Sequence, residues 1–136
     1  MKILIAVDGS RRAVAAVENV IEHAAWYREK PEIELVTVHL PVPAGLGGQR
    51  LARYYEEKGA ANLAIAKRRL DVAKLAYRSH VLVGQVADAI VKHARKTRCD
   101  LICMGSRGMT GIKQVVLGST ATKVLHVADR PVLVVT

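Results

Sequence analysis

Short apolar runs alternate along this chain with longer segments whose apolar residues recur at helical spacing, and this alternation constrains the fold more than any other feature. The first run, residues 2–7, is continuous after Lys2 and rich in Ile and Val, which is typical of a strand that is buried on both faces. Similar runs predict strands over residues 33–40, 79–83, 100–104 and 131–135. The segments between the runs predict helices over residues 13–28, 51–76, 86–96 and 119–127.

Predicted strands that alternate with predicted helices indicate an α/β fold. A helix between successive strands makes the sheet parallel, makes the crossovers right-handed and covers both faces of the sheet. We therefore expect a doubly wound five-stranded parallel sheet. With 136 residues, the chain falls in the size range of one domain, and we expect that domain to span residues 1–136.

The connection after the fourth predicted strand is rich in glycine. It holds Gly105, Gly108, Gly111 and Gly118. Glycines let the backbone approach a ligand closely, and the helix that follows Gly118 adds unpaired N–H groups at its amino end. This combination is typical of a phosphate site, although a long turn that only starts a helix is an alternative.

Polar side chains of the same segment strengthen the phosphate interpretation. Ser119 and Thr120 offer hydroxyl donors at the start of the helix, and Arg107 and Lys113 offer positive charge. The segment has no G-x4-G-K-S/T motif, so it is not a P-loop, and no G-x-G-x-x-G follows the first strand, which excludes a Rossmann dinucleotide site.

Asp8 ends the first predicted strand and is followed by Gly9 and Ser10. In doubly wound sheets, ligands bind beyond the carboxyl ends of the strands, where the strand order reverses. Asp8 would face the glycine-rich segment if the first and fourth strands are neighbours. Either Asp8 or Ser10 can cap the following helix; if Ser10 does so, Asp8 is left to accept hydrogen bonds from a ribose or an amino group.

The chain is strongly basic, with 21 Lys and Arg against 12 Asp and Glu and a formal net charge of +9. Such a charge attracts polyanions, so nucleic acid is a candidate partner. The chain has four Tyr, one Trp and no Phe, however, which leaves few side chains on which bases could stack. The basic residues are also scattered along the chain, which favours solvated helix faces over a polyanion site.

The cysteines and histidines predict neither a disulfide nor a metal site. Cys99 and Cys103 are four residues apart, so in a strand their α-carbons would lie about 13 Å apart, too far for a disulfide. The five histidines are dispersed and show no ligand spacing. No Ser or His stands in a catalytic motif, so we expect no catalytic residue.

We expect a cytoplasmic protein that does not contact membranes. No apolar run approaches the roughly 18–20 residues of a membrane span. The opening apolar run is interrupted by Asp8 too early for a secretory leader. Free thiols also suit a reducing compartment.

The spacing Gly105-x2-Gly108-x9-Gly118-Ser119 matches the pattern G-x2-G-x9-G-S/T, and here the chain resembles the ATP-binding members of the universal stress protein family. The resemblance extends over the whole chain. It includes the opening Ile-Leu-Ile-Ala-Val-Asp-Gly-Ser, the Val-His-Leu that ends the second predicted strand, the Asp-Leu-Ile-Cys-Met-Gly-Ser-Arg-Gly that begins at residue 100, and the Arg-Pro-Val-Leu-Val-Val that begins at residue 130.

The resemblance implies a sheet order of 3-2-1-4-5, which places the first and fourth strands together. It also implies a regulatory stress-response protein that binds ATP or other adenine nucleotides, with Mg²⁺ as a candidate companion of the bound ATP. The positions that it implies for the nucleotide are Ala6, Val7, Asp8, Leu40, Met104, Gly105, Arg107, Gly108, Gly118, Ser119 and Thr120. It further implies a homodimer through the last strand, Val132–Val135, whose apolar edge pairing would cover.

Two other functions stay open on the sequence. One is slow ATP hydrolysis or self-phosphorylation, for which no general base is evident beside Asp8, Ser119 and Thr120. The other is a basic protein that binds nucleic acid through its net charge.

Overall fold

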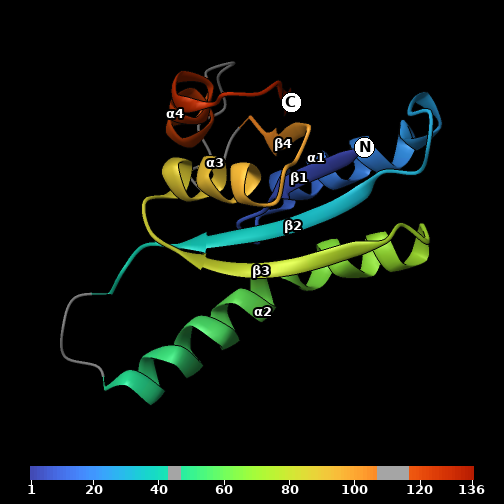
Figure 1. Cartoon of the computed structure of the whole chain (residues 1–136). Coiled ribbons are helices and arrows are strands. Elements are labelled where there is room, and N and C mark those ends of the chain that lie inside the picture. The colour runs from blue at the N-terminus through green and yellow to red at the C-terminus, as the bar shows by residue number, and fades with distance from the viewer. Residues whose placement is uncertain (43–46, 107–116) are drawn as a thin grey trace.

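A computed structural model describes residues 1–42, 47–106 and 117–136 of the chain (Figure 1). Its centre is a five-stranded parallel sheet in the order β3-β2-β1-β4-β5, as expected. The strands are β1 (Lys2–Ala6), β2 (Glu32–His39), β3 (Tyr77–Val83), β4 (Leu101–Gly105) and β5 (Val132–Val135).

Helices cover both faces of this sheet, so the fold is doubly wound. They are α1 (Arg11–Glu22), α2 (Gly48–Val72), α3 (Val86–Lys96) and α4 (Ser119–Val127), with a short 3-10 turn, η1 (Ala24–Trp26), after α1. Figure 1 shows α2 and α3 on opposite sides of β2 and β3. None of the described helices is both long and apolar enough to cross a membrane.

Alternate residues of each strand pack against opposite helix layers. In β1, Ile3 and Ile5 lie in a buried cluster with residues of α1 and α2, whereas Leu4 lies in a second cluster with residues of α3 and α4. All three side chains have no exposed surface. A strand that is buried on both faces needs apolar residues at successive positions, which explains the continuous apolar sequence of β1.

The first helix ends earlier than its apolar period predicts. The periodicity predicts a helix to residue 28, but α1 ends at Glu22 and η1 follows. The His23 side chain lies at this point, with Nδ1 2.8 Å from the carbonyl oxygen of Asn19. Since side-chain bonds to the last carbonyls are a common way to end a helix, this contact accounts for the change of path.

Both cysteines are free and buried. The Cys103 thiol is 3.7 Å from the carbonyl oxygen of Ala16, to which it donates, and burial raises its pKa to about 12. A thiol with that pKa is almost entirely protonated at neutral pH, so Cys103 is a packing residue of the core.

The order of the strands determines where a ligand can bind. β1 and β4 are neighbours, with Ala6 paired to Met104, while the chain leaves β1 toward α1 on one face and β4 toward α4 on the other. The sheet therefore reverses its strand order between β1 and β4, where a crevice forms at the carboxyl ends.

Candidate functional site

A cleft of about 260 Å³ lies at this reversal. Its walls come from the ends of β1, β2 and β4, the starts of α1, α3 and α4, and the residues that precede α4. The described lining residues are Ala6, Val7, Asp8, Ala13, Val38, Val86, Ile90, Met104, Gly105, Ser106, Gly118, Ser119, Thr120 and Ala121.

Asp8 and Ser10 have separate roles at one edge of the cleft. Ser10 is the cap of α1, and its hydroxyl accepts a hydrogen bond from the backbone N–H of Ala13 at 3.1 Å. Asp8 accepts the backbone N–H of Ser10 through Oδ1 at 2.9 Å, across the turn that Gly9 makes with a φ of +85°. Among the described residues, Oδ2 of Asp8 has no hydrogen-bond partner, so it can accept a bond from a ligand.

The floor of the cleft is apolar. Val7 and Met104 are nearly buried, and Val38, Val86 and Ile90 approach from the second strand and the third helix. Apolar walls with a few polar groups at the rim are typical of sites for small organic ligands, and a planar ring would bury its faces here.

The start of α4 forms the opposite edge. Gly118 is the helix cap, in extended backbone with φ −60° and ψ 157°, and its N–H donates to the carbonyl of Ser106 at 2.7 Å. The first N–H groups of an α-helix have no partner within the helix and carry a partial positive charge. Ser119 and Thr120 add hydroxyl groups there, so this edge is suited to an anion.

Gly105 brings the end of β4 against the start of α1. A Cβ atom at this position would lie 3.0 Å from the carbonyl oxygen of Arg12 and 3.6 Å from the α-carbon of Ala13. A larger residue would push the two backbones apart. This glycine therefore fixes the width of the cleft between β4 and α1.

Most of the residues expected at the site lie together in the cleft. Eight of them line it: Ala6, Val7, Asp8, Met104, Gly105, Gly118, Ser119 and Thr120. Leu40 does not line the cleft and is 57% exposed beyond the end of β2. Arg107 and Gly108 lie outside the described residues, as do Gly111 and Lys113.

Sequence reasoning missed six lining residues. They are Ala13, Val38, Val86, Ile90, Ser106 and Ala121. Val38 could have been predicted from the sequence. Strand alternation places it on the same face as Val36, which packs against the third and fourth helices. Ser106 could also have been found, because it directly follows Gly105 at the end of β4. The other four lie on helices, and their place depends on how the helices pack.

A second group of polar residues comes together away from the cleft. Glu34, His80 and His93 offer ligand atoms that all lie within 4.8 Å of one another. The histidines that look dispersed in the sequence are therefore not all separate in the fold, because His80 and His93 both lie beside Glu34.

The whole chain matches one protein family. The sequence model of the Universal stress protein family matches residues 1–136. Universal stress protein MJ0531 of Methanocaldococcus jannaschii is 33% identical over 137 residues, which cover 98% of this chain and 81% of that protein.

Solved structures match the same fold. Protein MJ0577 of Methanocaldococcus jannaschii superposes with a TM-score of 0.79 at 28% identity, over 98% of this chain and 94% of that one. The universal stress protein of Archaeoglobus fulgidus in complex with dAMP superposes with a TM-score of 0.67 at 23% identity, over 100% of this chain and 98% of that one.

Proposed function

The chain belongs to the universal stress protein family, and from this premise we propose that its cleft binds ATP or another adenine nucleotide as a regulatory signal. The observation that carries the proposal is the pairing of two edges across one apolar cleft. One edge holds Oδ2 of Asp8, which has no hydrogen-bond partner in the part of the chain that the structure describes, and the other holds the amino end of α4.

Each edge suits a different part of a nucleotide. A carboxylate accepts hydrogen bonds from ribose hydroxyls or an exocyclic amino group, and the apolar floor buries the faces of a purine ring. The N–H groups of α4, together with the hydroxyls of Ser119 and Thr120, bind phosphates. Arg107 and Gly108 complete the proposed phosphate site, and Leu40 its base contact; these three roles rest on the family resemblance.

Two further points support an adenine nucleotide. A protein of the same fold has been solved with dAMP bound. The glycine spacing that ends in Gly118 and Ser119 follows the pattern of ATP-binding members of the family. Mg²⁺ would enter with the triphosphate, because this ion is held largely by phosphate oxygens and water. The hydroxyls of Ser119 and Thr120 would be its nearest protein donors.

We also propose that the protein is a cytoplasmic homodimer. β5 is an edge strand of the sheet, and Leu133 at its centre is 36% exposed. An apolar edge with free backbone groups pairs readily with a second copy of itself. Antiparallel pairing of two β5 strands would extend the sheet across both subunits.

Isothermal titration calorimetry with ATP tests the nucleotide site. The protein is first freed of bound nucleotide, and circular dichroism confirms that each variant is folded. Asp8→Asn should weaken binding about 10–100-fold, the effect of losing a hydrogen bond to a charged group. Gly118→Val should abolish binding, because a branched side chain at the cap of α4 blocks the approach of the phosphates.

The chain offers a matched control for the second variant. Gly47 caps α2 with φ −61° and ψ 151°, close to the values of Gly118, and a Cβ at Gly47 meets no atom within 4 Å. Gly47→Val should keep full affinity. Binding that survives both Asp8→Asn and Gly118→Val, or a folded wild-type protein that gives no heat with ATP, would overturn the proposed function.

A further inference from the structure

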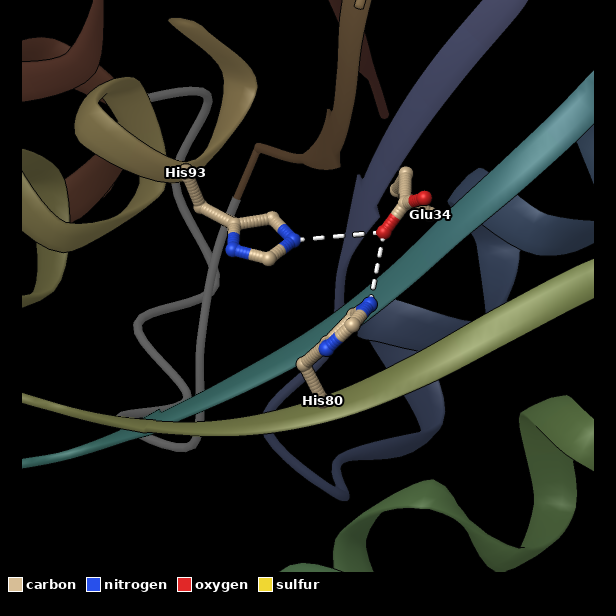
Figure 2. A group of neighbouring side chains, drawn as sticks. All are labelled: Glu34, His80 and His93. Carbon is tan, nitrogen blue, oxygen red and sulfur yellow. Dashed lines mark hydrogen bonds and ion pairs between the residues drawn. The ribbon is translucent and has the colours of Figure 1, made fainter. Parts of the chain in front are cut away.

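Three side chains from three elements converge on the face of the sheet that α3 covers (Figure 2). Glu34 lies on β2, His80 on β3 and His93 in the last turn of α3. Oε2 of Glu34 is 2.7 Å from Nε2 of His80 and 3.2 Å from Nε2 of His93. Two imidazole nitrogens therefore point toward one carboxylate oxygen.

The group is buried, and removing its polar atoms from water costs folding free energy. The Glu34 side chain is 4% exposed and the His93 side chain 9%. A buried carboxylate destabilises the fold unless a cation or strong donors compensate its charge. The Glu34 carboxylate therefore needs a cation or strong hydrogen-bond donors beside it in the folded protein.

Hydrogen bonds alone leave the group incompletely satisfied. His93 Nε2 forms a hydrogen bond with Glu34, but Nε2 of His80 is buried and has no partner in hydrogen-bond geometry among the described residues, despite its short distance to Oε2. A buried ring nitrogen without a hydrogen-bond partner is a position that a metal ion can satisfy.

We propose that Glu34, His80 and His93 bind a divalent transition-metal ion, with Zn²⁺ as the best fit. Two imidazoles and one carboxylate are a ligand set that proteins use for zinc, with water in the fourth position. At ordinary Zn–N and Zn–O distances, tetrahedral ligand atoms lie about 3.3 Å apart. The two distances to Oε2 of Glu34, 2.7 and 3.2 Å, are near that value, and all the ligand atoms lie within 4.8 Å of one another, so side-chain rotations would admit the ion.

The ion could reach the site from solvent, and once bound it would link elements of the fold. The His80 side chain is 36% exposed although its Nε2 is buried, so a rotation of this ring would open the site to solvent on the side of β3. A bound ion would join β2 to β3 and α3, which follow β2 in the sequence only after the long helix α2. It would also neutralise the buried charge of Glu34.

This site is separate from the cleft, so the proposal does not rest on nucleotide binding. Glu34 precedes Val38, the cleft residue of the same strand, by four positions, or roughly 13 Å along β2. A failure of ATP binding would leave the metal proposal intact, and the reverse also holds.

Competition between the metal-free protein and a chromophoric chelator for Zn²⁺ tests the proposal, with Co²⁺ absorption as a report of coordination geometry. We expect one equivalent of Zn²⁺ and a visible Co²⁺ spectrum of tetrahedral intensity. His80→Asn and Glu34→Gln should weaken binding by at least the 10–100-fold that losing an outer-shell partner costs. His126→Asn removes an exposed histidine of α4 and should leave affinity unchanged.

Thermal unfolding provides the second readout. Excess Zn²⁺ should raise the Tm of the wild type and of His126→Asn, but not that of His80→Asn, since an ion that binds only the folded state stabilises it. His80 is the most exposed of the three side chains, so its variant is the most certain to fold. No zinc binding by the wild type, or binding that His80→Asn and Glu34→Gln leave unchanged, would overturn the proposal. In that case, a proton shared between the Glu34 carboxylate and the two imidazoles would hold the cluster together in place of a metal ion.

Discussion

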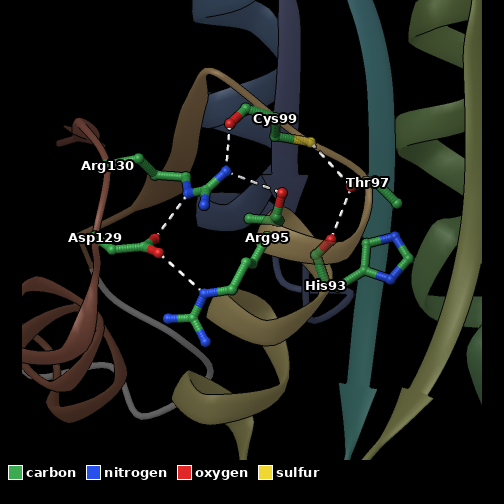
Figure 3. Close-up of polar contacts among 7 residues, drawn as sticks. His93, Arg95, Thr97, Cys99, Asp129 and Arg130 are labelled. Carbon is green, nitrogen blue, oxygen red and sulfur yellow. Dashed lines mark hydrogen bonds and ion pairs between the residues drawn. The ribbon is translucent and has the colours of Figure 1, made fainter.

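Arg130 joins three parts of the chain through one guanidinium group (Figure 3). Its Nη1 donates to the carbonyl oxygens of Ala94 in α3, at 3.0 Å, and of Cys99 before β4, at 2.5 Å. Its Nε donates to Asp129 at 2.9 Å, and Arg95 donates to the other oxygen of the same carboxylate at 3.0 Å. The residues that lead into β5 are thus fixed against the end of α3.

Asp129 predicts a pH dependence at the residue scale. Hydrogen bonds from Arg130 and Arg95 hold its pKa well below the usual range. Because the folded state binds its proton more weakly than the unfolded state does, the contribution of Asp129 is complete above its unfolded pKa of about 3.9 and declines as the pH falls below it. The contribution is small, because the pair is exposed to solvent.

Urea unfolding of the wild type and of Asp129→Asn measures this effect. The wild type should be more stable at pH 7, and the difference should shrink as the pH falls from 4 toward 2. Asp88→Asn, in the first turn of α3, serves as the exposed carboxylate control. A difference that stays constant over this pH range would show that Asp129 acts through something other than its charge.

At the scale of the element, Gly59 controls how closely α2 approaches β3. A glycine at this position is expected to weaken a helix, but in the fold it is buried. A Cβ at Gly59 would overlap the side chain of Val81 and lie 2.8 Å from its Cγ1. The missing side chain is therefore a packing requirement.

Gly59→Ala should destabilise the protein by about 1–2 kcal/mol. Overpacking costs roughly 1–3 kcal/mol, and the gain in helix propensity offsets up to about 1 kcal/mol of it. Gly48→Ala, in the same helix where a Cβ meets nothing, should be neutral or stabilising. Chemical denaturation measures both.

A double variant shows whether the contact is the cause. Adding Val81→Ala makes room for the new methyl group. The double variant, which carries both Gly59→Ala and Val81→Ala, should therefore lose less stability than the sum of the losses of the two single variants. Additive losses would mean that contact with Val81 is not what position 59 requires.

The local sequence predicts which helices and strands form, but it predicts their ends less well. α3 and α4 begin and end where their apolar periods predict, and the five strands occupy the five apolar runs. The end of α1 was missed because it depends on the His23 side chain, which apolar periodicity does not register. The role of Gly59 was missed because its partner is 22 positions further along, at Val81.

At the scale of the whole molecule, the two polar sites differ in how far the sequence predicts them. Asp8 and Gly118 stand at the ends of predicted elements, where a parallel fold concentrates ligand contacts, so their positions make them candidate site residues. Glu34 and His93 are 59 positions apart and meet only when α3 packs on the sheet. No local spacing carries that information.

The exposed edge of the sheet predicts the oligomeric state. Light scattering coupled to size exclusion should give the mass of a dimer for the wild type and of a monomer for Leu133→Lys, because a charge at the centre of β5 opposes pairing of the two edges. Val72→Lys, at an exposed position of α2, should remain a dimer. A monomeric wild type would contradict this assembly.

A crystal structure of the protein grown with ATP would show where the nucleotide binds. We expect the base on the apolar floor of the cleft, the ribose beside Asp8 and the phosphates at the first turn of α4. Nucleotide bound elsewhere on the surface, or a cleft filled by the protein's own side chains at saturating ATP, would contradict this expectation.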